Sequence, residues 1–290
     1  MSKINKQTSK ASCLSEYDRL RQVVLCQPTY MKISEVINET QKHFINENID
    51  IKLAMKQHDT LILTLEEHSI EVILLPPDES FPEQVFTRDI GFTLGRTVFV
   101  AKMGRKIRQG EETVLKTWLE QQHIAFYDLT KENIEGGDVL IDQHTIWVGI
   151  SDRTTEKASA KLQSLIPDYN VMSVPFKKKY LHLDCVFNVL SPDVALIFPP
   201  AFRKQELDLL AARYTLIEVT ESEQFTLGTN ILSIGNKRVI SLPVNKKVNE
   251  QLQKQGYHVI EVDISEIIKS GGSFRCITLP IVRDERRESQ

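Results

Sequence analysis

Residues 138–175 read DVLIDQHTIWVGISDRTTEKASAKLQSLIPDYNVMSVP and contain one complete structural unit. The apolar residues from Val139 to Val148 surround a polar turn at Asp142-Gln143-His144, which predicts two strands joined by that turn. A helix is expected to follow from Arg153, and the run from Val171 to Pro175 predicts a third strand. The order within this stretch is therefore strand, strand, helix, strand.

The same order recurs on both sides of this stretch. Two strands, a helix and a strand are expected upstream, within residues 86–129, and again downstream, within residues 186–219 and 231–262. A fifth unit begins at Gly271 and needs the N-terminal part of the chain, including the apolar strand at Val23–Leu25, to complete it. Five similar units predict an α/β fold that closes into a five-fold pseudo-symmetric ring.

A polar or reactive residue precedes the first strand of each unit. These residues are Asp89, Asp138, Asp184, Asn230 and Cys276, and subtraction gives separations of 49, 46, 46 and 46 residues. Equivalent positions in a ring lie at equal distances from its axis, so these side chains are expected to converge at one end of a central channel. The alternative is that each unit simply starts with a polar turn residue.

Composition limits the classes of protein and partner. The 290 residues favour an ordinary globular chain, and the register favours one domain over residues 1–290, with residues 1–13 as a loosely held tail. The 36 Lys and Arg residues against 39 Asp and Glu residues argue against a nucleic-acid surface. No apolar run reaches the length of a membrane span, and the four cysteines form no CxxC motif. We therefore expect a cytoplasmic protein without nucleic-acid or membrane partners, and a homodimer is left open.

One cysteine stands out as a candidate nucleophile. Cys276 follows a glycine pair in GGSFRC (271–276), where the backbone is free to approach another group closely. A buried, structural thiol is the alternative. The other cysteines are expected to be structural, with Cys185 and Cys26 filling the core and Cys13 exposed.

Candidate acid–base groups lie in two further stretches. In YLHLD (180–184), a strand would place His182 and Asp184 on the same side, where the carboxylate could orient the imidazole. Glu135 and Asp138 flank a glycine pair, and two close acids suit a cation, a metal or a shared proton. The sequence has no HExxH, P-loop, GxGxxG or GxSxG motif, so we expect no metal and no cofactor.

Four motifs in order, FTRD (86–89), EGGD (135–138), HLD (182–184) and GGSFRC (271–276), resemble the guanidino-group-modifying enzyme superfamily. That superfamily includes arginine deiminases, dimethylarginine dimethylaminohydrolases and amidinotransferases. The likeness covers nearly the whole chain after about residue 14. It implies the pentein fold, a five-bladed ββαβ propeller with a central active-site channel.

The resemblance also implies roles for nine residues. The implied catalytic residues are the nucleophile Cys276, the general acid–base His182 and its neighbouring acid Glu135. The implied substrate-binding residues are Asp89 and Asp184 for the guanidinium nitrogens, Arg108 and Arg153 for an α-carboxylate, Phe86 as an aromatic wall, and Asn230 lining the site.

The reaction implied by the resemblance is hydrolysis of a guanidino C–N bond. A covalent thiouronium on Cys276 would give a ureido product and ammonia or an amine. The stretch 74–83 looks like the dimethylarginine hydrolases, whereas Asp184 and the stretch 276–284 look like arginine deiminases. The substrate is therefore expected to be arginine or an N-methylated arginine. An amidinotransferase using the same adduct and a non-catalytic pentein-fold binding protein are the alternatives.

Overall fold

The structure is a computed structural model that describes residues 11–284, and its strands form five three-stranded sheets. Each sheet has a central strand that pairs antiparallel with one neighbour and parallel with the other. Four sheets are contiguous in sequence: β3 (Gly91–Leu94), β4 (Thr97–Val100) and β5 (Phe126–Asp128); β6 (Val139–Asp142), β7 (Thr145–Ile150) and β8 (Asn170–Pro175); β9 (Phe187–Val189), β10 (Val194–Ile197) and β11 (Thr215–Glu218); β12 (Leu232–Gly235), β13 (Arg238–Ser241) and β14 (His258–Glu261).

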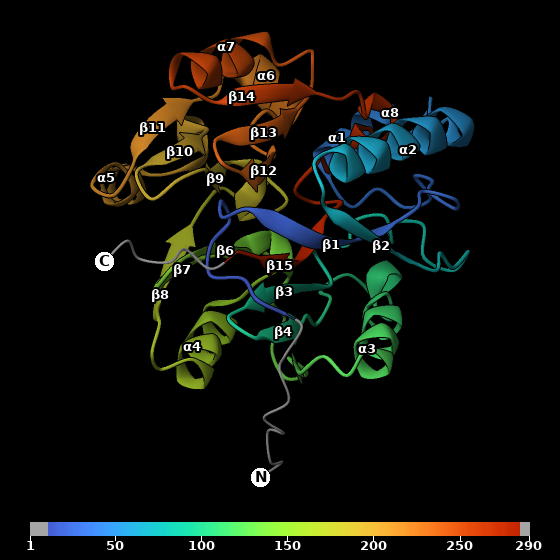
Figure 1. Cartoon of the computed structure of the whole chain (residues 1–290), viewed down its shortest axis with the longest axis horizontal. Coiled ribbons are helices and arrows are strands. Elements are labelled where there is room, and N and C mark those ends of the chain that lie inside the picture. Colours follow the sequence, from blue (N-terminus) through green and yellow to red (C-terminus); the bar gives the residue numbers. More distant parts are fainter. Residues whose placement is uncertain (1–10, 285–290) are drawn as a thin grey trace.

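The fifth sheet joins the two ends of the described chain. Strand β1 (Leu20–Cys26) pairs antiparallel with β15 (Leu279–Arg283) and parallel with β2 (Glu71–Leu75). Figure 1 shows the five sheets following one another around the centre of the molecule. The predicted five-fold ββαβ ring, closed by the N-terminal strand, is confirmed.

Helices connect the second and third strands of each unit and lie at the periphery (Figure 1). The first strands, such as β6 with all four residues buried, face the centre, whereas third strands such as β14 remain partly exposed. The helices are α1 (Glu39–Phe44), α2 (Ile51–Glu67), α3 (Glu112–Gln121), α4 (Glu156–Leu165), α5 (Lys204–Ala211), α6 (Glu221–Phe225), α7 (Lys246–Lys254) and α8 (Ser265–Ile268), with 3-10 turns η1 (Lys106–Arg108), η2 (Gly136–Asp138), η3 (Leu183–Cys185) and η4 (Pro199–Ala201).

Two predicted boundaries differ from the structure for local reasons. Helix α4 begins at Glu156 and not near Arg153, because the Thr155 side chain accepts a hydrogen bond from the Ala158 backbone N–H and caps the helix there. Residues 86–90, expected to start a strand, form turns, and β3 begins at Gly91. Both changes leave Asp89 and Arg153 outside regular helices and strands, where their side chains are free to face the site.

Hydrogen bonds at the register positions join all five units into a closed circle. Each unit contributes the register residue or its immediate neighbours, and every register side chain is buried. The bonds, donor first, are Arg88 N to Cys276 O (2.9 Å), Gly136 N to Asp89 O (3.0 Å), Leu183 N to Asp138 Oδ1 (2.8 Å), Asn230 Nδ2 to Asp184 O (3.2 Å) and Cys276 N to Asn230 Oδ1 (3.1 Å). The repeated spacing therefore marks where the units meet.

The expected loose tail is wrong where the structure describes it. Residues 1–10 lie outside the described residues, but Ala11 is buried, Ser12 pairs with Val282, and Cys13 pairs with Gly95. Cys13 is consequently buried and not exposed. Backbone pairing with β15 and with the β3–β4 turn supplies the packing that the polar composition of this stretch did not indicate.

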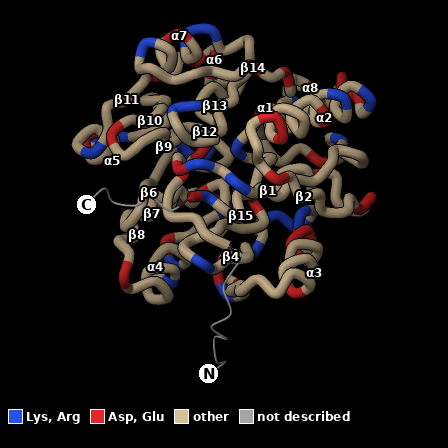
Figure 2. Tube along the Cα trace, in the orientation of Figure 1, with Lys and Arg blue, Asp and Glu red and all other residues tan. Residues whose placement is uncertain are grey.

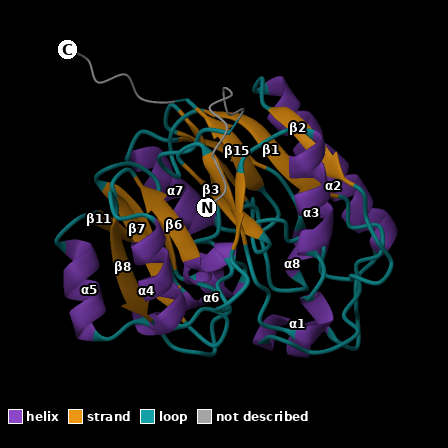
Figure 3. Ribbon diagram, turned by 90° about the horizontal axis from the view of Figure 1, so that it is seen from below, coloured by secondary structure: helices purple, strands orange, loops and turns teal. Residues whose placement is uncertain are grey.

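The surface carries both signs of charge, with Lys and Arg interspersed with Asp and Glu over the elements visible in Figure 2. Within residues 11–284, no helix has both the length and the apolar composition needed to cross a membrane. Figure 3, at right angles to the first view, shows α1 at one end of the molecule. That end carries the pockets described below.

Candidate active site

Two groups of buried side chains contain the predicted catalytic residues. The first group is Asp89, Glu135 and His182, whose ligand atoms lie within 4.8 Å of one another. Nε2 of His182 lies 2.7 Å from Oε2 of Glu135, and its Nδ1 lies 3.4 Å from Oδ1 of Asp89. The imidazole is therefore held between two carboxylates, which fix its orientation and favour its charged form.

These contacts change the protonation of His182 and Glu135. Burial alone would lower the pKa of His182, but the Asp89 charge and the Glu135 hydrogen bond outweigh it and raise that pKa. Burial alone would raise the pKa of Glu135, but the hydrogen bond and charge of His182, with Arg153 nearby, hold it well below its usual range. The pair therefore favours an imidazolium beside a carboxylate at neutral pH.

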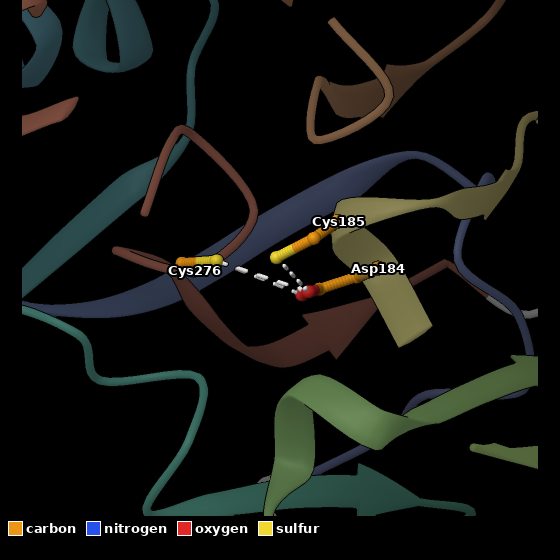
Figure 4. Close-up of side chains that lie close together, drawn as sticks. All are labelled: Asp184, Cys185 and Cys276. Atoms are coloured by element: carbon orange, nitrogen blue, oxygen red, sulfur yellow. Dashed lines mark hydrogen bonds between the residues drawn. The ribbon is translucent and has the colours of Figure 1, made fainter. Parts of the chain in front are cut away.

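The second group is Asp184, Cys185 and Cys276, shown in Figure 4. Sγ of Cys276 lies 3.8 Å from both carboxylate oxygens of Asp184, and Sγ of Cys185 lies 3.6 Å from Oδ1. The two cysteine side chains point toward this carboxylate from different elements, η3 and the loop before β15. The sulfur of the predicted nucleophile thus adjoins an acid able to bind a cation.

Hydrogen bonds from neighbouring residues hold Asp184 and the backbone of Cys276 in place. Asn230 accepts a hydrogen bond from the Cys276 N–H and donates one to the Asp184 carbonyl, at 3.1 and 3.2 Å. Arg275 Nη1 donates to Oδ2 of Asp184 at 2.6 Å, and its Nη2 donates to both Glu16 and the Val139 carbonyl. Asn230 therefore links the backbone of Cys276 to that of Asp184.

Glycines allow the two groups to pack closely. A Cβ on Gly137 would lie 2.7 Å from Nδ1 of His182 and 2.8 Å from Oδ1 of Asp89. A Cβ on Gly272 would lie 2.2 Å from Cε1 of Phe86, so that glycine admits the aromatic ring beside Cys276. The predicted aromatic wall at Phe86 is thus placed against the Cys276 loop.

Arg108 lies deeper than a residue that grips a substrate carboxylate. Its Nη1 donates to Asp89 at 2.6 Å, and its Nε and Nη2 donate to Glu111 at 3.0 and 2.7 Å. The guanidinium is buried, and its remaining contacts are the backbone oxygens of Glu83 and Phe86. In this arrangement Arg108 holds Asp89, and its N–H groups are already engaged by the protein.

Arg153 is also buried, but it lines a pocket next to the site. Its Nη1 lies 3.3 Å from Oε2 of Glu135, and its Nη2 donates to the Ile37 carbonyl at 3.4 Å. It lines a pocket of about 240 Å³ next to a second pocket of about 410 Å³, which Cys185 and Gly271 line. The two pockets share the start of α1 and the loop that precedes His182.

Two local interpretations are corrected by these contacts. His182 and Asp184 do not share a strand, because residues 183–185 form η3 and Asp184 turns toward Cys276 and Arg275. The carboxylates beside His182 are instead Glu135 and Asp89. A small, tight turn replaces the alternation that the pattern of residues 180–184 predicted.

Some residues of the site carried no sequence signal. Cys185, interpreted as core filling, has its sulfur beside that of Cys276. Arg275 and Glu111 each supply a buried partner for an acid or base of the site. The position of Cys185 directly after a register residue is the one signal that could have indicated its place.

The comparisons with known proteins agree with this geometry. The model of the family described as N,N dimethylarginine dimethylhydrolase, eukaryotic, matches residues 27–283. The uncharacterized protein YkgA of Bacillus subtilis is 52% identical over 97% of this chain and 99% of its own. The N(G),N(G)-dimethylarginine dimethylaminohydrolase of Mycobacterium tuberculosis is 27% identical over 91% of this chain and 86% of its own.

Solved structures give the same result. The N-terminal domain of ArgZ, an arginine dihydrolase from cyanobacteria, is 28% identical, with a TM-score of 0.84 over 90% of this chain and 98% of the other. The amidinotransferase SxtG from Microseira wollei, at 17% identity and a TM-score of 0.82 over 96% of this chain and 99% of its own, shares the fold. The family match and the shared pentein fold place the chain in the guanidino-group-modifying superfamily, and it belongs to the N,N dimethylarginine dimethylhydrolase family.

Proposed function

We propose that this protein hydrolyses the guanidinium group of arginine through a covalent adduct on Cys276, giving citrulline and ammonia. The coarser activity, hydrolysis of C–N bonds in linear amidines, follows from its family. The observation that carries the choice of substrate is the Asp184 carboxylate, 3.8 Å from Sγ of Cys276.

A carboxylate at this position selects nitrogens that carry hydrogens. A guanidinium carbon over Cys276 would place a terminal nitrogen beside Asp184. An ionised carboxylate accepts hydrogen bonds and has none to donate. An NH₂ group can donate to the Asp184 carboxylate, one oxygen of which Arg275 already holds, whereas a dimethylated nitrogen has no hydrogen to donate and forfeits this charge-assisted hydrogen bond, worth about 1.5–3 kcal/mol. Unmethylated arginine is therefore the favoured substrate over dimethylarginine.

The residues supply each step of the reaction. Asp184 accepts the S–H hydrogen bond of Cys276 and receives its proton as the sulfur attacks the guanidinium carbon. A C–S bond forms, the imidazolium of His182 donates its proton to the departing nitrogen, and the C–N bond breaks to release ammonia. His182 then takes a proton from water, whose oxygen attacks the same carbon. The C–S bond breaks, the Cys276 sulfur takes back the proton held by Asp184, and the remaining proton of the attacking oxygen passes to solvent as the ureido C=O forms.

The hydrogen-bonded pair His182–Glu135 suits both halves of this cycle. The Glu135 carboxylate stabilises the imidazolium before ammonia departs and again after water is deprotonated. Arg153, which lines the pocket next to the site, is the residue we assign to the substrate's α-carboxylate, because its guanidinium retains N–H groups beyond its two contacts.

A product assay tests this proposal. Purified protein is incubated with arginine, N-monomethylarginine, asymmetric dimethylarginine and agmatine, and ureido product and ammonia are both measured. We expect the highest kcat/KM for arginine, one ammonia per citrulline, and no product from Cys276→Ala, while the matched variant Cys13→Ala, at a buried thiol elsewhere, keeps full activity. Absence of any ureido product would reject the hydrolase, and preference for dimethylarginine would reject the substrate.

A second variant tests the role of Asp184 directly. Asp184→Asn keeps the size of the side chain but removes its charge, and we expect kcat/KM for arginine to fall on the order of 10²-fold. The ratio of dimethylarginine to arginine turnover should rise in the same variant. Transfer of the amidino group to an added amine, detected by mass spectrometry, would indicate the transferase instead. Cellular location and oligomeric state stay predictions.

A further inference from the structure

We propose that Cys185 is a resolving thiol for Cys276, so that a hydroperoxide converts the two cysteines reversibly into a disulfide at the active site. The proposal rests on the proposed function only for the nucleophilic role of Cys276. Its chemistry concerns a modification of the thiol pair and needs no substrate.

The geometry brings the two sulfurs together from separate elements. Cys185 lies at the end of η3, in the third unit, and Cys276 in the loop before β15, in the fifth. Their Sγ atoms and the Asp184 carboxylate lie within 4.8 Å of one another, and Figure 4 shows both side chains directed at that carboxylate. A disulfide needs the sulfurs about 2.05 Å apart, so rotation of the two side chains has to close the remaining gap.

The backbone segments that carry the two cysteines differ in conformational freedom. Asn230 links the Cys276 N–H to the Asp184 carbonyl and thereby fixes the separation of the two loops. The loop before Cys276 begins with Gly271, at a φ of +94°, followed by Gly272. Glycine at these positions gives the Cys276 loop conformational freedom that the 3-10 turn before Cys185 lacks.

A small oxidant has a route to the pair. Cys185 lines the pocket of about 410 Å³ together with Gly271, and both sulfurs are otherwise buried. Neither of the other two thiols shares this setting: Cys13 hydrogen-bonds the Pro280 carbonyl, and Cys26 lies in β1 against the Gln27 carbonyl. Among the four cysteines, Cys185 and Cys276 are therefore the pair that a peroxide entering this pocket would reach.

The chemistry balances in two steps. The Cys276 thiolate attacks the peroxide O–O bond, forming an S–O bond and releasing hydroxide or the corresponding alkoxide, so that sulfur is oxidised to sulfenic acid and peroxide is reduced. The Cys185 sulfur then attacks the Cys276 sulfur, an S–S bond forms, and the sulfenic hydroxyl leaves as water with the Cys185 proton. A dithiol such as dithiothreitol then reduces the disulfide by thiol–disulfide exchange, is itself oxidised to a cyclic disulfide, and restores both thiols.

The protonation of Cys185 agrees with its role as second thiol. Its contact with Cys276, together with burial and the Asp184 charge, raises the pKa of Cys185 well above the ordinary value. Cys185 therefore stays a neutral S–H group beside the nucleophile and does not compete with it for the peroxide.

Peptide mapping after peroxide treatment tests the proposal. The full-length protein is exposed to limiting hydrogen peroxide, its free thiols are alkylated under denaturing conditions, and it is digested with trypsin. Cleavage after Lys179, Arg203, Arg275 and Arg283 isolates Cys185 in peptide 180–203 and Cys276 in peptide 276–283. The wild type should give these two peptides joined by a disulfide, and dithiothreitol should separate them.

Two variants make the result decisive. With excess peroxide, a second peroxide should oxidise the Cys276 sulfenic acid of Cys185→Ser to sulfinic acid, and dithiothreitol should recover at least about tenfold less activity than in the wild type treated in the same way. Cys13→Ser, at a buried thiol away from the pair, should behave as the wild type. Sulfinic acid on Cys276 at equal rates in wild type and Cys185→Ser, with no joined peptides, would overturn the proposal. Because the peptides are read by mass, a protein without hydrolase activity would still decide the question.

Discussion

His182 and Glu135 share one short hydrogen bond, with Nε2 and Oε2 2.7 Å apart and both side chains fully buried. On its other side the imidazole faces Asp89, at 3.4 Å. Burial works against the charged imidazole, so its raised pKa depends on these two carboxylates. The acid–base function of His182 is therefore sensitive to a charge change at Glu135.

The first prediction removes that charge. Glu135→Gln keeps a hydrogen-bonding side chain of similar size but lowers the pKa of His182, so the imidazole loses its proton at a lower pH than in the wild type. We expect kcat for arginine to fall roughly 10²-fold and its alkaline limb to move toward neutral pH, measured from pH 5 to 10. Glu79→Gln, at an exposed carboxylate, is the control. An unchanged alkaline limb in Glu135→Gln would show that another group sets it.

The second prediction separates the two arginines that the sequence treated alike. Arg108→Met leaves Asp89 and Glu111 buried without their cation, which costs about 3–5 kcal/mol of unfolding free energy. Arg153→Met should raise KM for arginine about tenfold or more and cost less stability than Arg108→Met, because Glu135 keeps its 2.7 Å contact with His182 when Arg153 is removed. Thermal denaturation measures the loss of stability in each variant, and steady-state kinetics measure the change in KM. If Arg108→Met is as stable as the wild type but has a raised KM, Arg108 binds the substrate and does not have the structural role assigned to it here.

The third prediction concerns the glycine beside the imidazole. Gly137→Ala inserts a methyl group 2.7 Å from Nδ1 of His182 and 2.8 Å from Oδ1 of Asp89, so one of the two has to move. A displacement of about 1 Å in a catalytic group is expected to cost on the order of 10²-fold in kcat. Gly256→Ala adds backbone strain at a φ of +80° in a surface turn, away from the site. Equal kcat values in the two variants would contradict the steric argument.

The sequence predicted the features that repeat. The separations of Asp138, Asp184, Asn230 and Cys276 reflect one unit copied around the ring, and the hydrogen bonds between units run through these same positions. The closing of the fifth sheet by the N-terminal strand followed from the same count. Period and polarity are properties of the chain itself, and both were visible without coordinates.

The sequence could not predict which charges pair across units. Asp89 and Asp184 suggested free acids waiting for a substrate cation, but each already holds an arginine, Arg108 or Arg275. These partners lie 19 and 91 residues away, and neither spacing has a helical or strand period that would indicate contact. Cys185 was missed for the same reason, because its neighbour is set by the way two loops meet at the centre of the ring.

The final prediction concerns pH and the network that joins α1 to the Cys276 loop. Glu83 is buried and accepts hydrogen bonds from Gln41 and Ser270 at 2.7 and 3.0 Å. Burial raises the pKa of Glu83 to about 7, although Arg108 opposes the shift. Because the pKa in the folded state exceeds its ordinary value of 4.5, the carboxyl's contribution to stability is complete below about pH 4.5 and is lost as the pH rises through about 7.

Glu83→Gln is neutral at every pH and removes this dependence. The free energy of unfolding of the variant, relative to that of the wild type, should therefore rise by up to about 3 kcal/mol from pH 5 to pH 8. The melting temperatures of the two proteins, measured across this range, follow the change. Burial likewise raises the pKa values of Glu111 and Asp138 to about 7, and both residues remain in the variant. The stability of Glu83→Gln should therefore still fall as the pH rises, but less steeply than that of the wild type. Glu79→Gln removes an exposed carboxylate and serves as the matched control. Parallel pH curves for Glu83→Gln and the wild type would mean that Glu83 ionises in the fold as readily as in the unfolded chain, with Gln41, Ser270 and Arg108 offsetting its burial.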